Sequence, residues 1–402
     1  MDQLELTICH HGDGLITDVL GDELAEYYPF DFRRLINQSV DGCEFFLHEQ
    51  SKEISSEKSV PKFQCQEDYD VSGLTGIFTS SYQAPIVYSA TVKNCIVGPR
   101  SPSMPRYWPF FFNDRYAFNF LSAASKVDMA KSGYFSIDND VINVDLESKD
   151  KIHISGLSVW FYTFDNIDHL FRECLPGLLA LDEMGVAYRD VKFITPLISD
   201  DLVAFLQALG VPRDNILQFD NKWLSFEKLI IPCFGSFGHL HTPSSYYKKT
   251  SDMIRERVLA KGGGKYKSKN IYVSRRKARM RRVLNEDVIV PELEKRNFTI
   301  VDPGELSKVE QIRLFSCAEN IVGPHGMGVA NCIVSQNPNS LIEIMSTTLN
   351  KVSYFRSAQL SGMSYGCYYT VPLDLRFSLP SDPFGDVVLD KVKLMGFIDK
   401  FI

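Results

Sequence analysis

A glycine-rich turn with a histidine at its centre is the stretch best suited to bind an anion. It runs from Gly323 to Gly328, reads Gly-Pro-His-Gly-Met-Gly, and lies between a strand-like and a helix-compatible segment. Glycine lets backbone N–H groups approach a ligand, and a helix that begins there directs unpaired N–H groups and its positive dipole end at a phosphate. His325 adds a side-chain donor. The alternative is a plain strand-to-helix turn, which is common in α/β proteins.

A dense cluster of positive charge is the second candidate. The stretch from Tyr272 to Arg282 holds six cations and no acid, in a chain whose formal net charge is −7. The cations are Arg275, Arg276, Lys277, Arg279, Arg281 and Arg282. Arginine suits a phosphate ligand, because its planar fork grips two oxygens and keeps its charge. The cluster predicts a specific anionic ligand; the alternatives are a solvated surface and a patch for nuclear localisation or RNA contact.

A histidine with neighbouring carboxylates is the third candidate. His169 and Glu173 are four residues apart, so on a helix they share one face, and Asp168 lies beside them. A histidine that a carboxylate orients is a suitable general base. The alternative is an ordinary helix start, capped by Asp168 and with Arg172 paired to an acid. Pro176 predicts a kink or an interruption of this helix.

Patterns for other chemistry are weaker. Asp138, Asn139 and Asp140 form an acidic triplet of a kind that is frequent in loops, and Cys233, His239 and His241 lack an evident fourth zinc ligand. The sequence contains no serine nucleophile elbow and no Walker-type phosphate loop. We therefore predict no metal site and no cofactor.

Composition sets the outer limits. The 402 residues are 45% hydrophobic and 12% aromatic, which indicates a folded protein of two or three domains. The acidic balance argues against a general nucleic-acid binder. Nine scattered cysteines, no basic-then-apolar N-terminal signal and no apolar run of about 18 residues favour a cytoplasmic protein, unless a native leader was removed.

The texture of the chain predicts an α/β fold. Residues 1–150 read as short strands, with a mobile surface loop at 51–62 that is rich in Ser, Lys and Glu. Residues 151–243 alternate strands and helices. Expected strands are 158–162, 192–195, 216–219 and 228–231, and expected helices are 168–184 and one capped by Ser199.

The second β/α half, residues 244–380, is clearer. Its expected strands are 271–273, 298–301, 321–322 and 341–344. A helix over 244–259 precedes a hinge-like Gly262-Gly263-Gly264, and Ser307 with Glu310 form a capping box. Residues 381–402 include a helical segment. Parallel strands bind ligands at their carboxyl ends, and both the basic cluster and the glycine turn follow strands.

Four blocks in this order and spacing resemble glycosyltransferase family 61. They are residues 274–286, residues 298–303, Glu310-Gln311 and residues 321–331. A weaker block over 165–176 is similar to the N-terminal signature of that family. It departs from the signature at Asp168 and Leu170, where the family commonly has aromatic residues, and Met327 stands where a small residue is usual.

The resemblance implies a GT-B architecture, in which two Rossmann-like domains face each other across a cleft. Residues 1–150, a β-rich extension, and 151–243 would form the acceptor side. Residues 244–380 would bind the donor, and 381–402 would return as a helix to the first domain. The resemblance implies an inverting, metal-independent transfer from a nucleotide-diphosphate sugar, most often linked to uridine. The donor residues would be Arg275, Arg279, Arg281, Gly323, His325, Gly326, Met327, Gly328 and Glu343, the last toward ribose hydroxyls.

We expect a single displacement at the anomeric carbon, with His169 first and Asp168 or Glu173 next as the base. Closure around the glycine hinge would exclude water. The acceptor would be a glycan or a lipid-linked glycan in bacterial surface polysaccharide, lipopolysaccharide or capsule assembly, at the inner face of the cytoplasmic membrane. The aromatic stretch 106–118 would contact the acceptor or the membrane, or else pack inside its domain.

Two other functions stay open at this stage. A non-catalytic nucleotide- or glycan-binding protein of the same fold would bind the donor without turning it over. A nucleic-acid-binding protein would show an affinity that falls steeply with salt, and the acidic remainder of the chain argues against it. A homo-oligomer is compatible with each of these functions.

Overall fold

The chain is a mixed α/β protein with parallel strand pairs in each of two compact units. The first unit comprises residues 1–52, 85–165 and 169–239, and the second comprises residues 53–84, 166–168 and 240–402. The computed structural model describes residues 4–10, 42–67, 69–98, 111–112, 116–119, 135–138, 141–144, 151–161, 163, 166–195, 198–219, 222–232, 242–262, 266–349, 351–373 and 385–402.

Several predicted features fall wholly or partly outside the described residues. They are the acidic triplet at 138–140, the cysteine and histidines at 233–241, the aromatic stretch 106–118 and the hinge glycines 263–264. Among the described residues, no group of three or more His, Cys, Asp or Glu side chains could hold a metal ion. No helix in the described ranges has the length and apolar content that a membrane span requires.

The first unit contains one large sheet in the order β13-β12-β11-β14-β6-β7-β8-β1-β10-β9, with β2 also paired to β6. Its strands are β1 (Leu4–His10), β2 (Cys43–Glu49), β6 (Val87–Val97), β7 (Phe111–Phe112), β8 (Tyr116–Asn119), β9 (Phe135–Asp138), β10 (Val141–Val144), β11 (Lys151–Trp160), β12 (Lys192–Thr195), β13 (Ile216–Gln218) and β14 (Trp223–Pro232). Strands β11 to β14 pair in parallel, as the alternating texture predicts, whereas β6 is antiparallel to β14.

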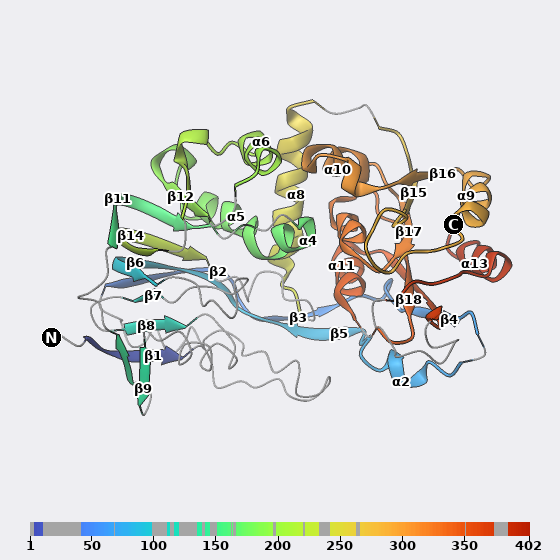
Figure 1. Ribbon diagram of the computed structural model, residues 1–402, viewed down its shortest axis with the longest axis horizontal. Coiled ribbons are helices and arrows are strands. Elements are labelled where there is room, and N and C mark those ends of the chain that lie inside the picture. The colour runs from blue at the N-terminus through green and yellow to red at the C-terminus, as the bar shows by residue number, and fades with distance from the viewer. Residues whose placement is uncertain are drawn as a thin grey trace. The chain divides into compact units, whose positions relative to one another are not determined.

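The helices of the first unit begin where the chain leaves β11 and β12. They are η2 (Leu170–Cys174), α5 (Pro176–Glu183), η3 (Tyr188–Asp190), α6 (Asp200–Ala208) and η4 (Arg213–Asn215), after the short α4 (Ile167–His169). The hydroxyl of Ser199 accepts a hydrogen bond from the N–H of Leu202, which confirms the predicted cap of α6. Figure 1 shows α5 and α6 on the same side of β11 and β12.

The predicted helix 168–184 is interrupted. Residues Leu170–Cys174 are π-helical, and the N–H of Leu175 donates to the carbonyl of Leu170 at 2.9 Å. Pro176 then stands at the first position of α5. Proline has no N–H for the preceding turn, so the regular helix ends before it and restarts with it. The interruption that Pro176 predicts is confirmed.

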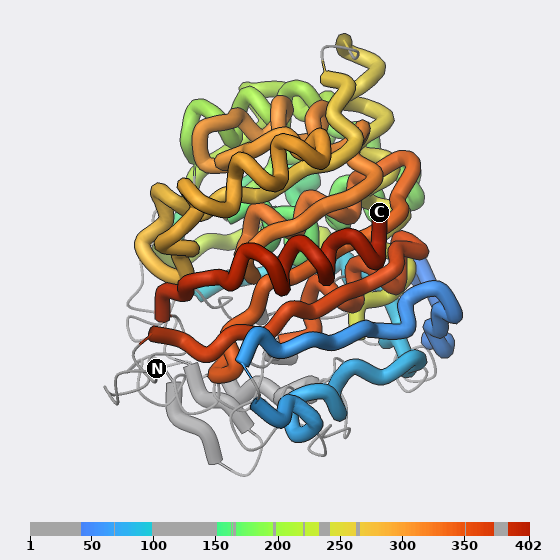
Figure 2. Tube along the Cα trace, turned by 90° about the vertical axis from the view of Figure 1, so that its right-hand side faces the viewer, coloured from blue at the N-terminus to red at the C-terminus, as the bar shows by residue number. Residues whose placement is uncertain are grey.

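The second unit is built on a parallel sheet in the order β16-β15-β17-β18-β19-β4. Its strands are β15 (Asn270–Val273), β16 (Phe298–Val301), β17 (Asn320–Pro324), β18 (Ser340–Ser346), β19 (Ser364–Thr370) and β4 (Lys62–Cys65). Strand β4 comes from far upstream in the sequence. Figure 2 shows it in blue beside the red strand β19.

Helices cover both faces of this sheet. They are α8 (Ser245–Ala260), α9 (Glu286–Glu294), α10 (Lys308–Phe315), α11 (Ser353–Ser361) and α13 (Lys391–Ile398), with the 3-10 helices η5 (Pro303–Glu305) and η6 (Met327–Val334). Helices α8, α10 and α11 lie on one side of β17 and β18, and α9 and α13 lie together on the other (Figure 1). Ser307 and Glu310 form the predicted capping box of α10.

Two segments differ from the sequence expectations. The expected loop at 51–62 contains strand β3 (Lys52–Ser55), which pairs with β5 (Ser81–Ala84), and residues 53–84, including α2 (Ser72–Thr75), group with the second unit. Short strands at the edge of a sheet often contain charged residues, so their sequences lack the alternating apolar pattern that predicts a strand. Helix α13 packs with α9 in the second unit, whereas a helix that returns to the first domain was expected. The apolar side chains Leu394, Phe397 and Ile398 explain this packing.

His48 on β2 predicts a pH dependence of folding. Its ring has no exposed side-chain surface; Nδ1 lies 2.7 Å from Glu183 Oε2, and Nε2 lies 2.8 Å from Ser89 Oγ. Burial lowers the pKa of His48, against the opposing effect of Glu183. On acidification the histidine is therefore protonated more readily in the unfolded chain than in the folded chain. The contribution of His48 to the free energy of unfolding is fully present above about pH 6.5 and is lost as the pH falls below it.

His48→Gln should reduce this loss of stability. The measurement is urea unfolding of the parent and of the variant across about pH 5 to 8, which spans the titration of an ordinary histidine. The free energy of unfolding of the variant should fall less on acidification. Parallel pH profiles for the two proteins would contradict the assignment.

Candidate active site

The basic cluster and the glycine turn meet at the carboxyl ends of two neighbouring strands. Strand β15 leads into the basic cluster and β17 into the glycine turn, and Tyr272 pairs with Val322 in their parallel register. A Cβ atom placed on Gly326 would collide with the guanidinium group of Arg275. The two segments predicted to share a phosphate ligand therefore lie in direct contact.

A buried carboxylate holds the basic cluster from below. Glu286, at the start of α9, is 2% exposed and accepts hydrogen bonds from the hydroxyls of Tyr272 at 3.1 Å and Ser274 at 2.7 Å. It also accepts from the backbone N–H of Arg275 at 3.3 Å. Because burial and Glu286 raise the pKa of Tyr272, the phenol keeps its proton and remains a donor. The start of the cluster is thus fixed through its backbone, which leaves the Arg275 side chain for another partner.

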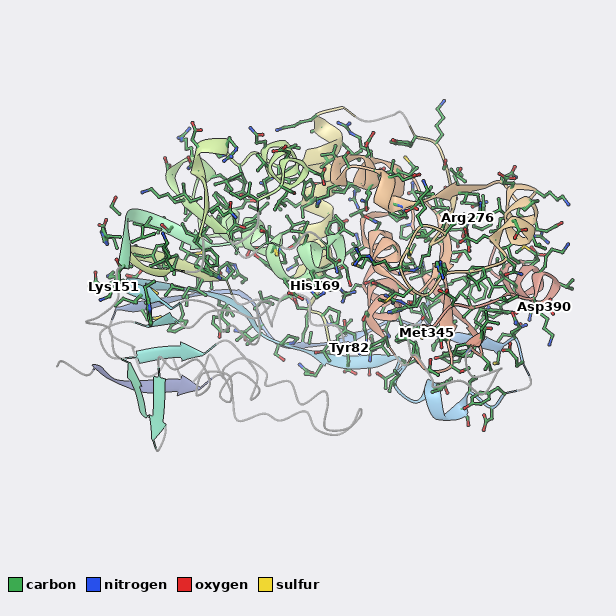
Figure 3. All side chains as sticks on the ribbon, in the orientation of Figure 1. Tyr82, Lys151, His169, Arg276, Met345 and Asp390 are labelled. Atoms are coloured by element: carbon green, nitrogen blue, oxygen red, sulfur yellow. The ribbon has the colours of Figure 1, made fainter. Side chains whose placement is uncertain are left out.

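The six cations divide into two kinds. Three form ion pairs: Arg276 with Glu286 at 3.7 Å, Lys277 with Glu305, and Arg282 with Asp386 at 2.5 Å. Arg276, labelled in Figure 3, marks the carboxyl end of β15. Among the described residues, neither Arg275 nor Arg279 has an acidic partner within ion-pair distance, and Arg279 is exposed.

Arg275 and Arg281 are partly buried and repel each other. Burial and the charge of Arg281 lower the pKa of Arg275 to about 10, and burial lowers the pKa of Arg281. The Nη2 atom of Arg275 donates to the carbonyl of Met280 at 3.0 Å, while its buried Nε has no hydrogen-bond partner among the described residues. The burial and mutual repulsion of two cations destabilise the folded protein, and a bound anion would offset both effects.

Arg281 also has a strained backbone, with φ of 57°. A side chain other than glycine costs about 1 kcal/mol in this left-handed region. Residues 385–387 hold it there, because the N–H of Arg282 donates to Asp386 and Val283 forms a β-bridge with Val387. In this conformation Arg281 lines a pocket together with Pro324 and His325 of the glycine turn.

Arg281→Gly should therefore raise stability and weaken binding of UDP. We expect the free energy of unfolding to rise by about 1 kcal/mol, as for other relieved left-handed residues, and UDP affinity to fall by about 10- to 100-fold. Asn297→Gly is the matched control, since Asn297 has φ of 61° and follows α9 away from the cluster. It should stabilise without changing affinity. A destabilised Arg281→Gly with full affinity would contradict the interpretation.

A hydrogen-bonded trio centres on His325. His325 is 8% exposed, and its Nδ1 lies 2.5 Å from Oε1 of Glu343 on β18. The other oxygen of Glu343 accepts from the Tyr365 hydroxyl at 2.6 Å. The His325 ring also packs against Tyr354, with centroids 4.9 Å apart. Glu343 has no exposed surface, which does not suit the expected contact with ribose hydroxyls.

A small pocket opens beside His325. Arg281, Pro324 and His325 line it together with Met345 and Ser346 at the end of β18. Figure 3 labels Met345 in this position. The pocket thus lies at the carboxyl edge of the parallel sheet, where ligands of such sheets are expected to bind.

Close packing explains two of the glycines. A Cβ on Gly323 would lie 2.8 Å from the Cβ of Val273, and a Cβ on Gly328 would lie 2.8 Å from both Pro303 Cγ and Val273 Cγ1. These two glycines let β17 and the turn pack against β15. Met327, which lies between Gly326 and Gly328 in the sequence, is 43% exposed.

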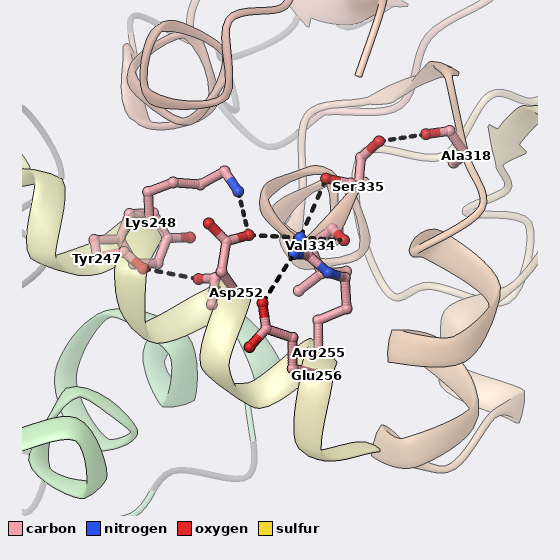
Figure 4. Close-up of polar contacts among 9 residues, drawn as sticks. Tyr247, Lys248, Asp252, Arg255, Glu256, Ala318, Val334 and Ser335 are labelled. Carbon is pink, nitrogen blue, oxygen red and sulfur yellow. Dashed lines mark hydrogen bonds and ion pairs between the residues drawn. The ribbon is translucent and has the colours of Figure 1, made fainter. Parts of the chain in front are cut away.

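The helix-compatible segment after the turn forms η6, a 3-10 helix. Its far end is clamped by α8, as Figure 4 shows. Arg255 donates to the carbonyls of Val334 and Ser335 at 3.4 Å and to Asp252 at 2.5 Å, and the Ser335 hydroxyl donates to Ala318 at 2.5 Å. The clamp gives hydrogen-bond donors to two carbonyls at the end of η6.

Gly328→Ala tests the packing of the turn. The added methyl has no room, so we expect a loss of about 1 to 3 kcal/mol in the free energy of unfolding. Gly396→Ala, in the middle of α13 with nothing within 4 Å of its added Cβ, is the control and should stabilise by about 1 kcal/mol. Chemical denaturation measures both. Equal effects of the two substitutions would contradict this packing.

The three predicted base residues lie around the start of η2. His169 Nδ1 is 2.6 Å from Glu173 Oε1, so the pair shares one face as predicted. Their side chains are 38% and 26% exposed. Asp168 is 7% exposed, and its Oδ2 accepts from the Tyr354 hydroxyl at 3.2 Å. Asn166, rather than Asp168, caps this helix start, since its Oδ1 accepts from the N–H of Asp168.

Comparison with known families decides the identity of this region. Residues 167–342 match the family described as Glycosyltransferase 61. These residues form a glycosyltransferase 61 domain. A sequence search against curated proteins gave no match. The resemblance seen in the sequence blocks is confirmed over these residues, and this domain supports a glycosyltransferase.

The glycosyltransferase 61 domain contains most of the residues described above. It begins at α4 with Asp168 and His169 and ends one residue before Glu343. Sequence reasoning missed Glu286, Tyr354, Tyr365 and Ser346. Because ligands bind at the carboxyl ends of parallel strands, the position of Ser346 after the expected strand 341–344 could have marked it as a site residue. No sequence signal marks the two tyrosines.

Proposed function

We propose that this glycosyltransferase moves a sugar from a nucleotide-diphosphate sugar to a hydroxyl of a glycan or lipid-linked glycan. The observation that carries the proposal is the meeting of Arg275 and Arg281 with His325 at one sheet edge. Two partly buried cations that repel each other call for an anion of more than one charge. The diphosphate of an activated sugar meets that requirement in a glycosyltransferase.

The cluster would act chiefly on the leaving group. In a single displacement that inverts the anomeric carbon, negative charge develops on the departing diphosphate. Arginine forks and an imidazolium placed at its oxygens stabilise that charge most in the transition state. We therefore propose transfer without a metal ion, with the cations of this chain in the charge-neutralising role.

The base would be His169. Its contact with Glu173 fixes the ring and compensates a proton taken from the acceptor hydroxyl. Asp168 is the second choice, because it is more buried and already accepts from Tyr354. His169→Ala and Glu173→Ala should lower turnover and leave donor affinity intact. Unchanged turnover in both variants would remove both residues as bases.

The finer parts of the proposal rest on the family and on the two units. Each unit contains parallel strands joined by helices, which suits a GT-B enzyme with the donor on residues 244–380 and the acceptor on the first unit. We propose a uridine-linked hexose or pentose donor and a role in bacterial surface polysaccharide assembly, such as lipopolysaccharide or capsule. The enzyme would act in the cytoplasm at the inner membrane face.

A thermal-shift panel tests the proposed function. UDP, UDP-sugars and other nucleotide sugars are added with EDTA, and each hit is incubated with candidate glycan acceptors and examined by mass spectrometry. We expect a rise in melting temperature with at least one nucleotide-diphosphate sugar, followed by a mass increase of one sugar. Binding without hydrolysis or transfer of any donor would support a non-catalytic protein instead.

A further inference from the structure

Glu343 is a buried carboxylate whose two oxygens both have partners. It lies in the middle of β18 with no exposed surface, 2.5 Å from His325 Nδ1 and 2.6 Å from the Tyr365 hydroxyl. A buried carboxylate is stable only when donors satisfy it. Burial and Glu343 raise the pKa of Tyr365, so the phenol is one such donor. The other must be the Nδ1–H of His325.

This arrangement leaves one ring nitrogen of His325 for a ligand. With Nδ1 bound to Glu343, Nε2 has no hydrogen-bond partner among the described residues, and His325 lines the pocket beside Arg281. A neutral ring presents a lone pair at Nε2, which cannot donate to a phosphate oxygen. Only the protonated ring donates from both nitrogens.

Charged and polar groups face the His325 ring from several elements. Glu343 on β18 lies 2.5 Å from Nδ1, and Arg281 of the basic cluster lines the same pocket as the ring. Tyr365 from β19 and Tyr354 from α11 are uncharged phenols, and Tyr354 in turn donates to Asp168. A diphosphate in the pocket would cancel the repulsion from Arg281 and add an acceptor for Nε2–H. Ligand and proton then stabilise each other.

We propose that the donor binds together with a proton, which His325 takes from solvent onto Nε2, and that Glu343 and Tyr365 are the positioning residues for this step. Their hydrogen bonds keep the first proton on Nδ1, and the Glu343 charge compensates the imidazolium. The second proton returns to solvent when the nucleotide diphosphate leaves. This inference rests on the proposed donor site. It assigns Glu343 to the positioning of His325, in place of the expected contact with ribose hydroxyls.

Proton uptake can be counted by calorimetry. UDP-glucose is titrated at about pH 8 in buffers of low and high ionisation enthalpy; its phosphates do not titrate there, so any proton taken up belongs to the protein. The parent should take up about 0.5 to 1 proton per donor bound, as for a single histidine. Glu343→Gln and His325→Gln should take up almost none and bind about 10- to 100-fold more weakly. His153→Gln, an exposed histidine on β11, should match the parent.

Tyr365→Phe guards against a folding defect in Glu343→Gln. It keeps the ring and removes only the donor to Glu343, so it should fold and show reduced proton uptake. Equal uptake in the parent, Glu343→Gln and His325→Gln, or donor binding by the parent without uptake, would overturn the inference.

The ¹⁵N signals of the ligand-free histidines test the positioning role without any donor. The His325 signal, identified by its loss in His325→Gln, should show the proton on Nδ1. A neutral ring protonated on Nε2 would overturn the inference even if UDP-glucose binds. The expected tautomer with no binding of UDP-glucose would contradict the proposed donor while supporting the role of Glu343.

Discussion

Arg275→Ala should lower kcat/KM for sugar transfer by about 100- to 1,000-fold, the range seen when one donor to developing negative charge is removed. Arg275 touches the glycine turn at Gly326, its buried Nε lacks a partner among the described residues, and it shares its surroundings with the like charge of Arg281. Because leaving-group charge grows toward the transition state, kcat should fall as well as affinity.

Lys277→Ala is the matched control for Arg275. Lys277 belongs to the same cluster, but its side chain is 68% exposed and pairs with Glu305. It should retain kcat/KM within about threefold of the parent, because an exposed ion pair contributes little. Steady-state kinetics with the donor found in the thermal-shift panel measures both. Equal losses would indicate a general electrostatic effect, and activity of Arg275→Ala within about threefold of the parent would refute its leaving-group role.

His325→Ala should lower donor affinity and turnover together. The His325 ring lines the pocket and is held there by its contact with Glu343. Removing the ring deletes a hydrogen-bond donor to the ligand and leaves the buried Glu343 carboxylate with Tyr365 as its remaining donor. We expect kcat/KM to fall by about 100-fold or more. Titration of UDP into the variant separates the affinity loss from the turnover loss.

The stability of His325→Ala needs its own comparison. Glu343 without its histidine partner is an unpaired buried charge, which destabilises the fold. The double variant with Glu343→Gln should recover stability but not turnover. Full UDP affinity in a folded His325→Ala protein would contradict the role of His325 at the diphosphate.

Sequence patterns marked the two segments that meet at the candidate site, but they did not show the packing around those segments. Basic residues after one strand and glycines after another are local signals, and parallel strands bring such ends to one edge. That β15 and β17 are direct neighbours, and that Gly326 lies against Arg275, depends on strand order. Order is set by long-range packing, which a single sequence does not display.

The misplaced features share that cause. Strand β4 and helix α13 join the second unit through contacts with distant residues: Ser59 donates to the carbonyl of Met363, and Gln66 accepts from the N–H of Asp390. Glu343 has the pattern of a strand residue, and only its neighbours His325 and Tyr365 show that it serves the histidine. Local patterns locate donors and strand ends, whereas the partner of a buried polar group depends on the fold.

Calorimetric titration of UDP in the presence of EDTA tests the central claim most directly. The claim is that Arg275, Arg281 and His325 form a diphosphate site. The parent should bind UDP saturably, with competition by inorganic pyrophosphate, and Arg275→Ala should lose most of this affinity while Lys277→Ala keeps it. Equal affinity of the parent and Arg275→Ala for UDP would contradict the account.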